Sequence, residues 1–588
     1  MRRSATIRYG AGQLSLAAGA LALLWAAVTL LSGGFSARLG LLGLSSRDPV
    51  RPLVAGLGLL IAARLLLPAA DFRSTVRILR GEGDQLAARI ALTAAAGVLI
   101  VAVAWNTRAA GGSDSSCYVL QAAAFAQGRV SLPSPLAQVL PGATPAMFAP
   151  TGFVPSRAAP FAPVPICGPG LALVMAAVSV AGRSALFLVV PAFAALAVWL
   201  TFLLGRRLDD GVTGAGAAVL LATSPIFLYQ SVQPMSDVPA AALWLAALVS
   251  LIGARTGAHE ARGQVVGGLC ASAAVLMRPN IALIVLPLLA LLRDRRGWVR
   301  MTVAAVPGLA SMAWLNAARY GSPLASGYGS TDALFSFAHV APNLTRYPRW
   351  LVETETPFVV LAFLAPWWAW RHPDRRRSIL VSLVAVVLTA ATYFAYTVFD
   401  EWWYLRFVLP ALPVLAVFSV AVLLESFRNH SRVRTGAAMA VCAMVGAWHV
   451  HLARTHHVFD LQALESRFVV TGRYASRALP VNAVVLAVQQ SGSLRFHGGR
   501  ETIAWDALPA DALDRTIAWL RANGRAAVIA LEDGEEPRYR ARFAGERYGV
   551  LDWPPSAVVH GPVRVRIYDP AGRDDYVNGR PRPTADVR

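Results

Sequence analysis

Long apolar segments recur along the first three quarters of this sequence, and they constrain the fold more than any other feature. A helix needs about 20 apolar residues to cross roughly 30 Å of hydrocarbon. The chain is 56% hydrophobic and 15% charged, whereas a soluble protein has roughly 25% charged residues. The sequence therefore predicts an α-helical polytopic membrane protein with about 13 transmembrane helices. They are expected at residues 14–32, 53–70, 87–105, 184–204, 212–229, 238–254, 264–277, 280–292, 299–316, 357–370, 378–398, 405–425 and 435–452.

Arginine is distributed unevenly between the two sets of loops. One set contains 20 Arg in 67 residues, and it comprises residues 1–13, 71–86, 205–211, 255–263, 293–298, 371–377 and 426–434. The long loop 106–183 contains only four. Because positive residues beside a span resist translocation, we expect a cytoplasmic N-terminus and an outer loop 106–183. Within that loop, residues 169–182 would form a short apolar helix along the interface, since a crossing there would reverse the later loops.

The segments on either side of Arg278 are short. They are either two crossings or one re-entrant hairpin, and both versions return the chain to the side that it left. The remaining topology is therefore the same for both.

The sequence changes character after about residue 455. Alternating residues 484–490, a helical stretch at 510–522 and apolar runs at 527–532 and 563–569 indicate a strand, a helix and two further strands. We therefore predict a transmembrane module over residues 1–454 and a small α/β domain over residues 455–588, on the outer side of the membrane.

Charge and cysteine content exclude several classes of function. The net charge of +21 would suggest nucleic acid in a soluble protein, but here it follows the loops, and no basic groove with interleaved aromatic residues is present. The histidines and the four cysteines form no pattern with the spacing of a metal site. Cys117 and Cys167 share the predicted outer loop, so the sequence permits a single disulfide between them.

Polar residues with chemical potential gather at the predicted outer ends of the helices. A carboxylate there can simply cap a helix, and clustered Trp and Tyr are typical of the interfacial belt, although aromatic faces also bind sugars. An arginine beside apolar segments costs roughly 2.5 kcal/mol or more unless it is paired, so Arg278 either pairs with a carboxylate such as Asp237 or holds an anionic ligand. The candidate residues are Asp114, Tyr118, Asp237, Arg278, Tyr328, Tyr404 and Arg406.

Taken together and in this order, these motifs resemble the GT-C membrane glycosyltransferases. That class includes the protein O-mannosyltransferases and the transferases that add aminoarabinose to lipid A. The resemblance rests on Asp114 with Tyr118, on the helix after residues 165–169, on Ser236-Asp237-Val238-Pro239, on Arg278-Pro279 and on Tyr404-Leu405-Arg406. It implies inverting transfer of a sugar from a polyprenyl-phosphate donor to an envelope glycan, lipid or protein on the outer face of a bacterial cytoplasmic (inner) membrane.

The resemblance also implies roles for the candidate residues. Asp114 would be the general base that takes the proton of the acceptor hydroxyl. Arg278 and Arg406 would stabilise the leaving phosphate, since the planar guanidinium suits phosphate oxygens. The other four candidates, Tyr118, Asp237, Tyr328 and Tyr404, would contact the substrates.

One departure from the family concerns a metal. Several relatives carry an acidic pair in the first outer loop, whereas here Asp114 is followed by Ser115. A divalent metal that needs two carboxylates would have to use Asp237 or Asp400 as well. We therefore expect no obligatory cofactor, with a divalent metal as the alternative.

Two other functions fit the same topology. A transporter or flippase of lipid-linked saccharides would place paired ionisable groups near the bilayer midplane and often shows inverted repeats. A membrane sensor would not require so many crossings. Because the polar candidates lie at the outer ends, the sequence favours a one-sided enzyme over both.

Overall fold

The computed structural model describes residues 83–254, 260–426 and 431–587 continuously. It also describes residues 35–39, 42–46, 50–66 and single residues between 15 and 48. The predicted crossing at 14–32 therefore lies largely outside the described residues, and the one at 53–70 is described as far as residue 66.

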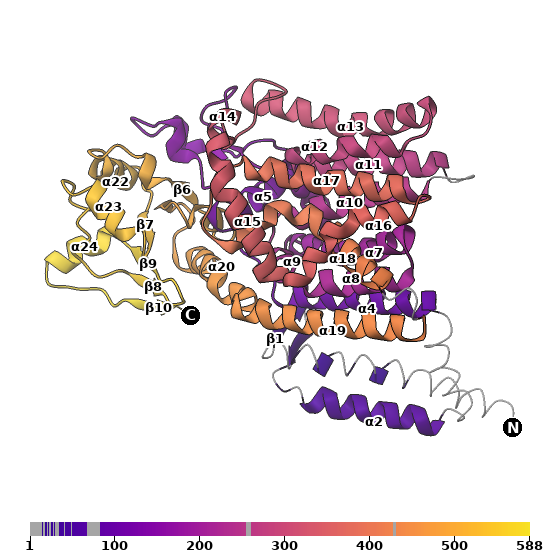
Figure 1. Cartoon of the computed structure of the whole chain (residues 1–588). Coiled ribbons are helices and arrows are strands. Elements are labelled where there is room, and N and C mark those ends of the chain that lie inside the picture. The colour runs from indigo at the N-terminus through magenta and orange to yellow at the C-terminus, as the bar shows by residue number, and fades with distance from the viewer. Residues whose placement is uncertain are drawn as a thin grey trace.

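The described part of the transmembrane module is a bundle of helices that run side by side (Figure 1). Each of the predicted apolar segments from residue 87 onward coincides with a helix or with two or three consecutive helical segments. The helices are α2 (Val50–Leu66), α4 (Gly83–Ala104), α7 (Val189–Leu208), α8 (Gly211–Thr223), α9 (Pro225–Ser231), α10 (Asp237–Gly253), α11 (Glu260–Met277), α12 (Ala282–Val285), α13 (Arg295–Tyr320), α16 (Ala365–Arg371), α17 (Arg376–Phe394), α18 (Leu412–Ser426) and α19 (Ser431–Thr455). Four 3-10 segments extend them, η5 (Pro279–Ile281), η6 (Leu286–Leu291), η8 (Pro357–Leu364) and η9 (Trp402–Ala411).

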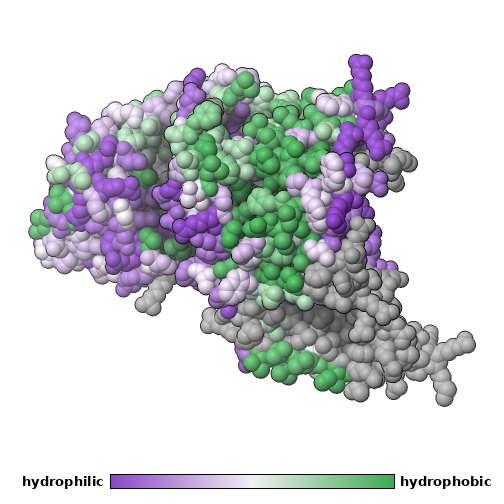
Figure 2. All heavy atoms as spheres, viewed as in Figure 1, coloured by the Kyte–Doolittle hydropathy of each residue, from purple (hydrophilic) through white to green (hydrophobic). Residues whose placement is uncertain are grey.

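The surface of the bundle is that of a multi-pass membrane protein. Figure 2 shows hydrophobic residues gathered over the middle of the bundle, with hydrophilic residues toward both ends. On α13, Val303 and Trp314 are more than 60% exposed, and an apolar face of this extent needs lipid around it. Within the described residues, five helical stretches are long and apolar enough to cross a membrane, or six if α8 and α9 are one bent span. The larger number of crossings stays a prediction.

Small residues allow the helices of the bundle to approach closely. A Cβ on Gly205 of α7 would lie 2.6 Å from the Cα of Gly214 on α8, so the two backbones touch at this crossing. The polypeptide bends by 63° between α8 and α9. Ser224 stabilises this bend because its hydroxyl accepts a hydrogen bond from the amide of Phe227 and caps α9.

Two long segments project from one end of the bundle. The first contains α5 (Gly112–Phe125), α6 (Pro169–Val178) and the two-stranded pairing of β3 (Phe153–Val154) with β4 (Val164–Pro165). The second contains α14 (Thr331–Leu334) and α15 (Val340–Glu355). With ten residues, α6 is only about 15 Å long, which is too short for a crossing. Cys117 and Cys167 form a disulfide that joins α5 to the start of α6.

The C-terminal domain is an α/β unit that follows α19 and begins with α20 (Leu461–Ala478). Its six-stranded sheet has the order β10-β8-β9-β7-β5-β6. The strands β6, β5 and β7 are parallel, and β9 is antiparallel to both β7 and β8. The strands are β5 (Val484–Leu486), β6 (Glu501–Ile503), β7 (Ala527–Glu532), β8 (Ala557–Val559), β9 (Val565–Tyr568) and β10 (Ala585–Val587), and the helices are α21 (Ser491–Phe496), α22 (Leu513–Ala522), α23 (Glu536–Arg542) and α24 (Pro570–Val577).

The α/β class of this domain is as predicted, but the first strand is shorter than expected. The strand predicted over 484–490 ends at Leu486, and the chain turns into α21 at Ser491. The alternation of apolar and polar residues continues past the end of the strand because Val488 packs against the apolar core of the domain. Val488 itself is not part of the β-sheet.

Candidate active site

A cavity of about 880 Å³ lies at the end of the bundle from which the two long segments project. Its walls come from α5, from the facing ends of α10, α11 and α17, from the start of η9 and from the loop between α13 and α14. In Figure 1, α5, α14 and α15 lie between the bundle and the C-terminal domain. The structure places all seven residues singled out in the sequence on the walls of this one cavity, namely Asp114, Tyr118, Asp237, Arg278, Tyr328, Tyr404 and Arg406.

Asp114 lies in the first turn of α5 and pairs with an arginine from another part of the chain. Its Oδ2 atom accepts a hydrogen bond of 2.9 Å from Nη2 of Arg406. The hydrogen bond to Arg406 fixes the Asp114 side chain. Because this side chain is also 31% exposed, a substrate in the cavity can reach it. The interpretation of Asp114 as a helix cap is wrong, because the N-cap is Gly111 and no side chain caps this helix.

Asp237 and Arg278 form a second ion pair, which is more deeply buried. Asp237 lies in the first turn of α10 and is 2% exposed, and it accepts a hydrogen bond from Nη1 of Arg278. Here too the cap interpretation is wrong, since the N-cap is Ser236 and its helix has no side-chain cap. The helix N-terminus still favours the carboxylate, because the backbone dipoles are positive at that end.

The backbone around Arg278 is fixed by close packing. Arg278 is extended, with φ −144° and ψ 112°, as expected for a residue before proline. A Cβ on Gly168 would lie 2.8 Å from the carbonyl oxygens of Leu276 and Met277. The start of α6 therefore rests directly on the end of α11 and leaves no room for larger residues there.

Tyr118 joins α5 to α10. Its hydroxyl shares a hydrogen bond of 2.6 Å with Oγ of Ser236, and burial raises the pKa of Tyr118 to about 12. The phenol is therefore protonated at neutral pH and can act as a hydrogen-bond donor. The disulfide at the preceding residue, Cys117, holds the same turn of α5 against the start of α6.

An aromatic wall completes the cavity, and most of it was not predicted from the sequence. Phe399 and Tyr404 stack with ring centroids 3.8 Å apart, and the guanidinium of Arg406 lies 5.4 Å from the ring of Tyr404. The lining residues that the sequence analysis did not single out include Ser113, Asn280, Ser326, Tyr396, Phe399 and Phe407.

The carboxylates at this site are engaged by arginines. Each of the two that line the cavity, Asp114 and Asp237, is already bound to a guanidinium, and a metal would have to displace both arginines. Asp400 accepts a 2.5 Å hydrogen bond from Arg346 and does not line the cavity. In the described part of the chain, no three His, Cys, Asp or Glu residues are grouped so that they could hold a metal.

Two solved structures share this architecture. ArnT from Cupriavidus metallidurans, in a crystal structure with undecaprenyl phosphate, has a TM-score of 0.53 at 14% identity, and the match covers 81% of this chain and 97% of ArnT. The chain has the GT-C fold. The Archaeoglobus fulgidus oligosaccharyltransferase tethered to an acceptor peptide has a TM-score of 0.50 at 13% identity, with 80% and 73% of the two chains covered.

Sequence comparison gives a shorter match. The family model described as dolichyl-phosphate-mannose-protein mannosyltransferase matches residues 164–317. This range contains Asp237 and Arg278 but ends before Tyr328, Tyr404 and Arg406. Comparison with the sequences of curated proteins gives no match.

Proposed function

We propose that this GT-C chain is a glycosyltransferase. It transfers a sugar from a polyprenyl-phosphate donor to an acceptor hydroxyl on the outer face of a bacterial cytoplasmic membrane. The observation that carries the proposal is that one cavity holds a reachable carboxylate, Asp114, together with the guanidinium groups of Arg406 and Arg278. ArnT, with its bound undecaprenyl phosphate, and the mannosyltransferase family model support the donor class.

Asp114 is proposed as the general base. As the acceptor oxygen bonds to the anomeric carbon, its proton passes to the carboxylate, and the bond from that carbon to the phosphate oxygen breaks with both electrons on the oxygen. Attack opposite the leaving phosphate inverts the anomeric centre. Arg406 orients the carboxylate before the acceptor arrives, because its guanidinium donates a hydrogen bond of 2.9 Å to Oδ2 of Asp114.

The two arginines are proposed to hold the leaving phosphate. A guanidinium has five N–H donors, and each arginine uses only part of this set on its aspartate. The remaining donors can face a phosphate in the cavity. Negative charge that develops on the leaving oxygen is then stabilised by groups that are already in place.

The volume and the lining of the cavity fit a sugar phosphate. Pockets for ligands of this size are typically about 300–1,000 Å³, and this one has a volume of about 880 Å³. Tyr404 and Phe399 offer ring faces, while Tyr118 and Asn280 offer polar groups. The site residues Tyr118, Tyr328, Tyr404 and Asp237 are therefore proposed to contact or position the substrates.

The distribution of arginine supports the proposed orientation. With the N-terminus in the cytoplasm, the cavity and the C-terminal domain face outward, where a lipid-linked sugar and an envelope glycan, lipid or protein acceptor would meet. Because all the polar candidates line a cavity at one end of the bundle, the arrangement favours an enzyme over a transporter, which would need access from both sides.

The test uses a strain that lacks the gene and is complemented with the wild type or with Asp114→Asn at equal membrane abundance. The proposal predicts that the deletion strain accumulates one polyprenyl-phosphate sugar and lacks one envelope glycan. Only the wild type should restore both to normal. Complete restoration by Asp114→Asn would refute the role of the base and favour a flippase.

A further inference from the structure

The C-terminal domain is built into the support of α5, the helix that carries Asp114. We infer that Phe468 and Gly492 of this domain, together with Gly111 at the start of α5, are positioning residues that hold Asp114 in place for the reaction. The inference rests on the proposed function, since it assigns to the domain a part in the same chemistry. It goes beyond that proposal because it makes the active site a product of two domains.

The first contact is between Gly111 and Phe468. Gly111 is the N-cap of α5, and a Cβ at this position would lie 2.2 Å from Cγ and Cδ2 of the Phe468 ring. Phe468 belongs to α20 and is 1% exposed. The ring therefore packs against the backbone three residues before Asp114. Because it is buried, it cannot move aside into solvent.

The second contact lies one turn further along α5. A Cβ on Gly492 of α21 would lie 2.1 Å from Oγ of Ser116 and 2.7 Å from the carbonyl oxygen of Ala110. Ser116 is fully buried, and its hydroxyl has no hydrogen-bond partner. The contact between Gly492 and Ser116 is therefore one of close packing and not a hydrogen bond. Together, the two contacts lie before and after Asp114 in the sequence, at Gly111 and at Ser116.

Hydrogen bonds hold the flanking segments to the same domain. Before α5, the amide of Gln462 donates to the carbonyl oxygens of Ala104 and Asn106, at 3.2 and 2.9 Å. After α5, the hydroxyl of Thr151 donates to the carbonyl oxygen of Val488 at 2.7 Å. The first outer loop is thus attached to the C-terminal domain both before and after α5.

A single carboxylate connects the two contact points inside the domain. Glu532, at the end of β7, accepts hydrogen bonds from Nε of Arg467 at 3.0 Å and from the amide of Gln490 at 2.8 Å. Arg467 precedes Phe468, and Gln490 lies two residues before Gly492. Relative movement of the two contact points would break these buried bonds.

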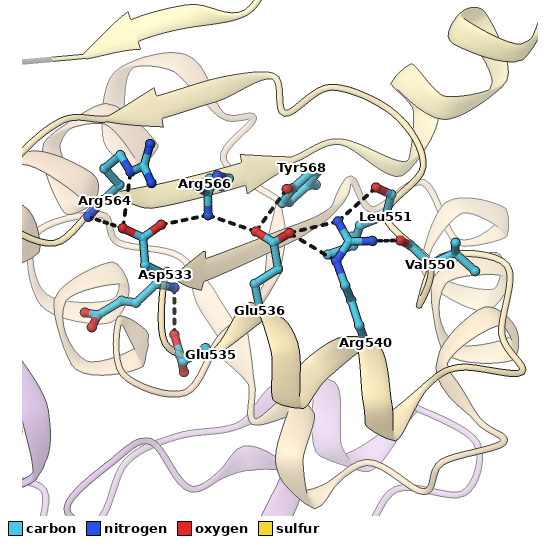
Figure 3. Close-up of polar contacts among 10 residues, drawn as sticks. Asp533, Glu535, Glu536, Arg540, Val550, Leu551, Arg564, Arg566 and Tyr568 are labelled. Atoms are coloured by element: carbon cyan, nitrogen blue, oxygen red, sulfur yellow. Dashed lines mark hydrogen bonds and ion pairs between the residues drawn. The ribbon is translucent and has the colours of Figure 1, made fainter.

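A network of charged residues stabilises the turn after Glu532 (Figure 3). Glu535 accepts from the backbone amide of Glu532 at 2.9 Å. Arg566 on β9 pairs with both Asp533 and Glu536, at 2.8 and 2.9 Å. The domain therefore presents its contacts to α5 from a rigid frame, as a positioning element requires.

The experiment adds one methyl group at each contact. Gly111→Ala and Gly492→Ala are each expected to lower kcat by about 10²-fold, the loss typical of an ångström-scale displacement of a reacting group, with the donor KM little changed. Helix propensity does not explain a loss at Gly492, since alanine is the better helix former. The matched control is Gly534→Ala in the same domain, where a Cβ meets nothing within 4 Å, and it should behave like the wild type.

A second substitution tests the contact directly. Ser116→Gly removes the two nearest atoms that a Cβ on Gly492 would meet, but the carbonyl oxygen of Ala110 would remain 2.7 Å away. The double variant should therefore recover part of the lost kcat. Hydrogen exchange supplies a readout that does not depend on activity. The α5 amides should exchange faster in Gly492→Ala, while the β7 amides stay protected.

Each outcome is decisive. Wild-type kcat in both glycine variants, or unchanged exchange of α5, would overturn the inference. If Gly492→Ala also exposes β7, Gly111→Ala decides, because its substitution lies outside the C-terminal domain. If the wild type transfers no sugar, the proposed function fails, and the exchange result still tests whether the domain holds α5.

Discussion

The two Asp–Arg pairs in the cavity differ in burial, and this difference predicts opposite effects of two similar substitutions. Asp237 is 2% exposed, and the side chain of its partner Arg278 is 19% exposed. Asp237→Asn leaves the charge of Arg278 buried without a counter-charge, and breaking a buried pair in this way costs about 3–5 kcal/mol. We therefore expect Asp237→Asn to be strongly destabilised.

The outer pair should respond in the opposite way. The side chain of Asp114 is 31% exposed, while that of its partner Arg406 is 15% exposed. Water can therefore replace part of the interaction lost at the carboxylate, and Asp114→Asn should cost less stability than Asp237→Asn. Its effect on catalysis should be large, because a general base contributes roughly 10²–10⁴-fold to the rate. One variant thus loses stability and the other loses activity.

The assay compares purified variants in nanodiscs. Unfolding is followed by heat and by denaturant, and sugar transfer is measured at a temperature where each variant is folded. The double variant Asp237→Asn/Arg278→Gln removes both charges and should regain most of the stability while it remains poorly active, since Arg278 is proposed to bind the phosphate. Equal stability of Asp237→Asn and Asp114→Asn would refute the reasoning from burial.

Three further predictions follow from the same structure. Loss of the Cys117–Cys167 disulfide, which closes a loop of 50 residues, should lower stability by about 4 kcal/mol; a reductant should lower the Tm of the wild type but not that of the variant with both cysteines changed to serine. Burial lowers the pKa of His497 from its ordinary 6.5 to about 4, so the folded state disfavours the protonated ring. The free energy of unfolding is therefore unaffected by His497 above pH 6.5 and falls by about 3 kcal/mol by pH 4. His497→Gln should remove this fall from the pH profile of stability. An unchanged profile in the variant would contradict the prediction. Chelation with EDTA should leave sugar transfer intact, and loss of activity that Mg²⁺ or Mn²⁺ restores would contradict the absence of a metal.

The helical part of the fold could be predicted because a bilayer imposes a simple length rule on apolar sequence. The described helices follow the apolar segments, and the short α6 is too short to cross. The sheet was harder to predict, since β6, β8 and β10 have only three residues each. A pattern with a period of two cannot be recognised over so few residues.

The candidate residues came from charges and aromatic residues placed where apolar helices end. That signal identified four residues that the structure places on one cavity, namely Asp114, Asp237, Arg278 and Arg406. The pairing of Asp114 with Arg406 spans 292 residues, so no local pattern could reveal it. The aromatic wall was missed because Phe399 and Phe407 lie at the ends of the apolar segments 378–398 and 405–425, where aromatic residues are typical of the interfacial belt. The support of α5 by Phe468 and Gly492 depends on the contact of two domains, which a single sequence does not encode locally.

The most direct test of the central claim is sugar transfer by the purified protein in liposomes. The donor is the lipid-linked sugar extracted from the deletion strain, and the products are the glycosylated acceptor and free polyprenyl phosphate. The account predicts that the wild type forms both products in equal amounts and that Asp114→Asn, folded and bound to the same donor, is slower by about 10²-fold or more. Equal rates for the two proteins would contradict it.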